Sequence, residues 1–109
     1  MLRSISRTWS VGPIALLVLM AMPAHALVVA DPAKGEIIAK RWCATCHLVS
    51  PDQKMASSDV PSFASLAHSK LSSEALRVFL SNPHPRMPDM DLTRSEIADI
   101  VAYIRSLDR

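Results

Sequence analysis

Residues 42–47 read WCATCH, and this stretch decides how the chain folds. Its cysteines, Cys43 and Cys46, are three positions apart, and His47 follows the second directly. The chain of 109 residues has 2 cysteines in all, and they stand too close together for a disulfide to close a useful loop. The pattern C-x-x-C-H is instead typical of covalent haem attachment, in which two thiols bind one haem and the adjacent imidazole binds its iron.

Three other sites built on paired cysteines fit the sequence less well. A thiol-disulfide centre is expected in a βαβ unit, and no strand pattern is present. A zinc site needs two further ligands, and His68 and His84 do not stand at metal-ligand spacing. Free, inert thiols would oxidise in an exported protein. Haem is therefore the favoured interpretation.

The first 26 residues have the pattern of a secretory signal peptide. Two arginines precede an apolar run (residues 14–21, IALLVLMA), and Ala24-His25-Ala26 has the small-x-small pattern of a cleavage site. We expect cleavage after Ala26, export to the periplasm and a mature domain of residues 27–109. An uncleaved membrane anchor is the alternative, but prolines interrupt the apolar stretch, which falls short of the ~20 residues that a span requires.

Charge and size limit the function of the mature domain. Cleavage would remove Arg3 and Arg7, so that the 12 basic and 10 acidic residues of the whole chain become ten of each. A domain of near-zero net charge without a basic cluster is not expected to bind nucleic acid. Domains of roughly 80 residues rarely have a sufficient apolar core of their own, so a large apolar cofactor is expected to stabilise this one.

The hydrophobic pattern predicts an all-α domain. Helices are expected from Ala33 to about Trp42, for one turn within 63–68, from Ser72 or Ser73 to about Leu80, and after a capping box of Thr93 and Glu96. Residues 48–70 otherwise read as a long loop, and the proline-rich segment 82–92 (NPHPRMPDMDL) as an extended loop.

These features resemble the class I c-type cytochromes over residues 33–107. A helix enters the C-x-x-C-H motif, a methionine follows in a proline-rich loop, and an amphipathic helix closes the domain. Residues 85–93 (PRMPDMDLT), followed by Glu96-Ile97 and Tyr103-Ile104, are similar to the family's M-P-x-x-x-L-T…E-I…Y-I ending. The resemblance implies a small cytochrome c fold of three to four short helices packed around one covalently attached haem c.

The resemblance also implies the roles of individual residues. Cys43 and Cys46 would hold the haem through thioethers, and His47 and Met87 would be the axial ligands of its iron. Pro61 would orient His47, because its carbonyl would accept the proton on the far ring nitrogen.

Two further features concern the helix crossing and the propionates. Gly35 would let the first helix cross the last one closely, opposite Tyr103. The family's middle-loop tryptophan has no counterpart here, so the groups that would bind the haem propionates are not identified.

Other residues compete with Met87 for the iron. Met55 is eight residues after His47, too near to reach the opposite haem face, and His84 is a weaker rival in the same loop. Met90 lies between two aspartates, whose charges would sit poorly inside a haem pocket. Met87 precedes a proline and has the family's spacing to the final helix, and both features favour Met87 as the second iron ligand.

Two axial ligands would leave no open position on the iron, which disfavours catalysis there. We therefore expect a periplasmic one-electron carrier between redox partner proteins, without enzymatic activity and without a stable membrane anchor. A haem subunit docked permanently to a periplasmic dehydrogenase is one alternative. A haem sensor or weak peroxidase with an exchangeable sixth ligand is another.

Overall fold

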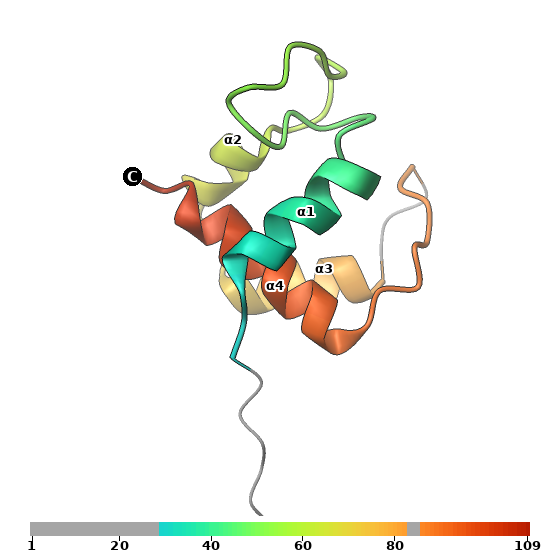
Figure 1. The fold of residues 1–109 in the computed structure, drawn as a ribbon, viewed down its shortest axis with the longest axis vertical. Helices are drawn as coiled ribbons and strands as arrows, with labels where there is room; N and C mark the ends of the chain where they lie inside the picture. The colour runs from blue at the N-terminus through green and yellow to red at the C-terminus, as the bar shows by residue number, and fades with distance from the viewer. Residues whose placement is uncertain (1–28, 83–85) are drawn as a thin grey trace, which may run out of the picture.

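The computed structural model describes residues 29–82 and 86–109 (Figure 1). Over these ranges it contains four helices and no strand: α1 (Pro32–Trp42), α2 (Phe63–Ala67), α3 (Ser73–Ser81) and α4 (Arg94–Ser106). The all-α prediction is confirmed: the first three helices begin and end within two residues of their expected bounds, and the fourth begins directly after its expected Thr93 cap. The predicted signal peptide of residues 1–26 and its cleavage site, like His84, lie outside the described residues.

Side-chain caps explain where the helices begin. The Asp31 carboxylate accepts hydrogen bonds from the first turn of α1, and serine hydroxyls do the same at α2 and α3. At α4 the Thr93 hydroxyl accepts from the Glu96 N–H, and the Glu96 carboxylate accepts from the Thr93 N–H at 2.8 Å. The two bonds complete the predicted capping box, and the hydrogen bonds that the Thr93 N–H and hydroxyl donate to the Glu96 carboxylate lower the pKa of Glu96.

The first and last helices cross at Gly35. A Cβ atom built on this residue would lie 2.0 Å from the carbonyl oxygen of Asp99 and 2.9 Å from the Ile100 nitrogen. The predicted close crossing is therefore confirmed. The nearest atoms to Gly35 belong to the backbone of α4 at Asp99 and Ile100, and the hydroxyl of Tyr103, one turn later, donates to the Val49 carbonyl at 2.7 Å.

The Asp99 side chain adds a second tie at the same crossing. It is buried, and its carboxylate accepts a hydrogen bond of 2.7 Å from the backbone N–H of Asp31. Asp31 in turn caps α1. The start of α1 is thus fixed to the middle of α4 by one backbone contact and one charge-assisted hydrogen bond.

The core forms around α4, which contacts each of the other three helices. Ile100 and Ile104 are fully buried, and they belong to one cluster with Ala39 of α1, Phe63 of α2 and Leu76 of α3. Side-chain caps thus define where the helices begin, and α1, α2 and α3 each pack against α4 (Figure 1).

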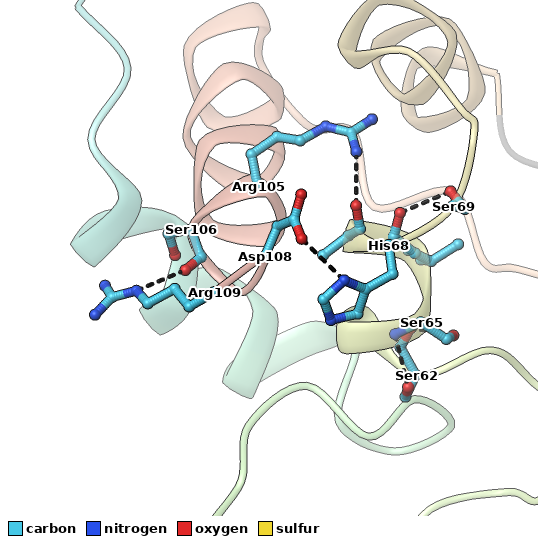
Figure 2. Close-up of polar contacts among 10 residues, drawn as sticks. Ser62, Ser65, His68, Ser69, Arg105, Ser106, Asp108 and Arg109 are labelled. Carbon is cyan, nitrogen blue, oxygen red and sulfur yellow. Dashed lines mark hydrogen bonds and ion pairs between the residues drawn. The ribbon is translucent and has the colours of Figure 1, made fainter.

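The end of α4 is joined to the link between α2 and α3 (Figure 2). The Arg105 guanidinium donates to the carbonyls of Ala67, at 3.1 Å, and Leu71. His68 Nδ1 lies 2.8 Å from an Asp108 carboxylate oxygen. The His68 and Asp108 side chains are both exposed, so we expect their contact to contribute little stability. We expect the Arg105 hydrogen bonds to hold the link between α2 and α3.

Replacing Gly35 by alanine is predicted to destabilise the holoprotein by about 1–3 kcal/mol, because the added methyl group would overlap the backbone of α4. Elsewhere in a helix the same change usually stabilises, by roughly 0.5–1 kcal/mol, so the sign alone tests the crossing. Denaturant unfolding measures the effect, with the exposed Lys34→Ala on the same helix as the control. Equal or greater stability in Gly35→Ala would contradict the crossing.

Candidate haem-binding site

The two cysteines lie in the turn that ends α1. Cys43 is the C-cap residue, and its N–H donates to the Ala39 carbonyl at 2.8 Å. The Cys43 carbonyl then accepts from the N–H groups of Cys46, at 3.2 Å, and His47, at 2.9 Å. The tight turn keeps both thiols and the imidazole close to the end of α1.

The two thiols have different surroundings. Cys46 is exposed, whereas Cys43 is buried, and burial raises the pKa of the Cys43 thiol to about 11. That thiol is therefore neutral at neutral pH. Neither thiol is part of a disulfide.

The His47 ring is held by the carbonyl of Pro61. Its Nδ1 lies 2.6 Å from the Pro61 oxygen. A carbonyl oxygen can only accept, so Nδ1 carries the proton and the lone pair of the neutral ring stays on Nε2. The ring also packs against Phe63, with centroids 5.7 Å apart. The hydrogen bond that the resemblance implies is thus present, and it leaves Nε2 able to bind a metal.

The backbone after the motif is held from several directions. The carbonyl of Cys46 accepts from the Ser57 N–H at 3.0 Å, and that of Leu48 accepts from the Phe63 N–H at 2.9 Å. The carbonyl of His47 accepts from the Gln53 side chain at 2.9 Å. Sequence analysis did not identify Gln53, because a single glutamine in a polar loop has no spacing signal.

The candidate second ligand lies in the segment between α3 and α4. Met87 and Met90 are both half-buried, whereas Met55 is 84% exposed. The Asp91 N–H donates to the Asp89 carboxylate at 3.0 Å, and Asp91 adopts a left-handed conformation (φ 49°) that aspartate tolerates. Met90 is therefore enclosed in a side-chain-stabilised turn just before α4. In the view of Figure 1 this segment and the end of α1 lie on the same side of the molecule.

These residues fit a covalently attached haem. They provide two unpaired thiols, an imidazole with a free Nε2 and a thioether, which together form the donor set of haem c. Leu48, directly after the motif, is a large apolar side chain that is exposed as well. Residues 29–82 and 86–109 hold no cluster of three or more His, Cys, Asp or Glu side chains arranged to bind a metal ion.

Comparison with known proteins agrees with this chemistry. The family model described as cytochrome C oxidase, cbb3-type, subunit III matches residues 30–104. The chain belongs to the class I c-type cytochromes. It is 50% identical to cytochrome c-552 of Bradyrhizobium diazoefficiens over 95 residues, which are 86% of this chain and 91% of that protein. No solved structure matches it.

Membership in the family confirms two of the predictions from sequence. The fold is that of a small cytochrome c, and the cofactor is haem c. This cytochrome is accordingly an electron carrier that exchanges electrons with redox partner proteins. In the described part of the chain, no helix is both long and apolar enough to cross a membrane.

We predict that either Cys43→Ala or Cys46→Ala will leave little stable holoprotein, because each change removes one of the two candidate attachment points. Thr45→Ala, at an exposed position of the same motif, is the matched control and is expected to load haem normally. Two measurements test this prediction: the amount of haem that stays with the protein after acid-acetone extraction, and the intact mass of each purified variant. Extractable haem in the parent protein would refute covalent attachment at this motif.

Proposed function

We propose that this cytochrome is a periplasmic one-electron carrier whose haem iron is bound by His47 and Met87. The observation that supports the proposal most strongly is the 2.6 Å hydrogen bond between His47 Nδ1 and the Pro61 carbonyl. It fixes the ring tautomer in which Nε2 can bind iron, and it makes that nitrogen a stronger donor.

Each residue of the proposed site has a separate task. Haem supplies the one-electron redox centre when it is bound. Cys43 and Cys46 would attach it to the end of α1, and His47 would bind its iron through Nε2. Met87 would supply a second ligand, and a neutral thioether would favour the reduced state and raise the potential. An iron held by both residues would be closed to small molecules, so we propose a carrier and not an enzyme.

The proposed location follows from the first 26 residues, which have the pattern of a cleaved signal peptide. Both thiols are free of disulfides and so are available for haem attachment. The proposed partners are redox proteins of the same compartment that donate and accept single electrons.

A haem subunit of a larger complex is the second candidate. Val78 is 60% exposed and Phe79 is 42% exposed on α3, and they line a shallow hollow together with Ala75 and Asn82. An exposed apolar surface of this kind can bind a permanent partner.

Holoprotein from the periplasmic fraction is predicted to behave as a monomer, to accept one electron per haem and to bind added carbon monoxide or cyanide only slowly. Gel filtration of the native extract, redox titration and ligand-binding spectra measure these properties. Elution as part of a larger assembly would support the docked subunit. Rapid ligand binding would indicate the sensor or peroxidase and contradict the carrier.

The choice between Met87 and Met90 is tested by two separate substitutions. Met87→Ala is predicted to abolish the red absorption band of sulfur-ligated ferric haem and to lower the midpoint potential, because a thioether favours ferrous iron. Met90→Ala, three residues away, is the control and is expected to keep both. If only Met90→Ala lost the band, the ligand assignment would be wrong.

A further inference from the structure

The side chain of Gln53 binds four backbone groups of the loop that follows α1. Its Oε1 accepts from the Val49 N–H at 3.0 Å. Its Nε2 lies 2.9 Å from the Ala44 carbonyl oxygen, 2.9 Å from that of His47 and 2.7 Å from that of Met55, and its two N–H groups are shared among these three acceptors. One amide therefore uses both its acceptor and its donors within a single loop.

One of the four partners is the proposed iron ligand, His47, and the other three lie before and after it in the sequence. Ala44 lies inside the C-x-x-C-H motif, His47 ends it, and Val49 follows two residues later. Val49 is also held from the other side, because its carbonyl accepts from the Tyr103 hydroxyl at 2.7 Å. Gln53 thus connects the attachment motif to Val49, which is itself hydrogen-bonded to α4.

The two contacts of His47 control different parts of the residue. Pro61 holds the ring through Nδ1, and Gln53 holds the backbone carbonyl of the same residue. A ring can keep a bond of 2.6 Å to a fixed carbonyl only if its own backbone stays in place. Of the bonds that hold this backbone, the one from Gln53 acts on the His47 carbonyl itself, so its loss is expected to lengthen the contact with Pro61.

We propose that Gln53 is a positioning residue for the proximal ligand, which keeps the His47 backbone where its ring can bind the Pro61 carbonyl and the iron at once. The inference depends on the proposed role of His47 as an iron ligand. Through the Pro61 bond, Gln53 makes the imidazole a stronger donor and so stabilises oxidised iron.

Gln53→Leu in the holoprotein tests this role, because leucine fills similar space without hydrogen-bonding groups. The midpoint potential is expected to rise, and the paramagnetically shifted NMR signals of the His47 ring in the oxidised protein are expected to move or broaden. The control is Arg105→Ala, which removes hydrogen bonds at the far end of α4. It is expected to lower the melting temperature while leaving the potential and the His47 signals unchanged.

Gln53→Glu separates the donors from the acceptor. Glutamate still accepts from the Val49 N–H but cannot donate to the carbonyls of Ala44 and His47, so the His47 signals are expected to change as they do in Gln53→Leu. The new negative charge itself alters the potential, and only the NMR signals of this variant are compared. Should Gln53→Leu fail to load haem, Gln53→Glu alone decides.

His47→Ala distinguishes failure of this inference from failure of the proposed function. If His47→Ala keeps the low-spin spectrum of the parent, His47 is not the ligand and the proposed site itself is wrong. If His47 is required but the Gln53 variants have the parent's His47 signals, the positioning role of Gln53 is refuted and the proposed function stands.

Discussion

The contact between Gly35 and the backbone of Asp99 and Ile100 determines where the rest of the molecule can lie. Because α1 has no side chain at this point, it approaches α4 far more closely than other residues would allow. The haem-attachment motif begins directly after the last turn of α1, at Cys43. The position of the thiols is therefore set by a helix crossing two turns away. The other helix of that crossing is α4, which also provides much of the core.

From α4 the same constraint extends to the loop after the motif. Tyr103, one turn beyond Asp99, donates to the Val49 carbonyl, and Phe63 at the start of α2 donates its N–H to the Leu48 carbonyl. A loop of this length would ordinarily lose much conformational entropy on folding. Hydrogen bonds from α4, α2 and Gln53 offset part of that cost, and they do so at the residues adjacent to His47.

The helices were predictable from sequence because their signals are local. The serine and threonine caps, the capping box of Thr93 and Glu96, and the apolar stripe of the last helix each act within a few residues. The roles of Gln53 and Arg105 were not predictable, since each depends on how distant segments meet. For the site, the motif identified the residue types, and the structure added the backbone hydrogen bonds that hold them.

The two proposed ligands of the iron are held in different ways. Within the described residues, the His47 side is fixed by bonds to its ring, its N–H and its carbonyl, from three separate residues. Near Met87, Pro88 restricts the backbone directly after it, and the Asp91 N–H donates to the Asp89 carboxylate. A thioether is also the weaker donor. In the proposed His47 and Met87 site, ligand exchange is therefore expected to begin at Met87.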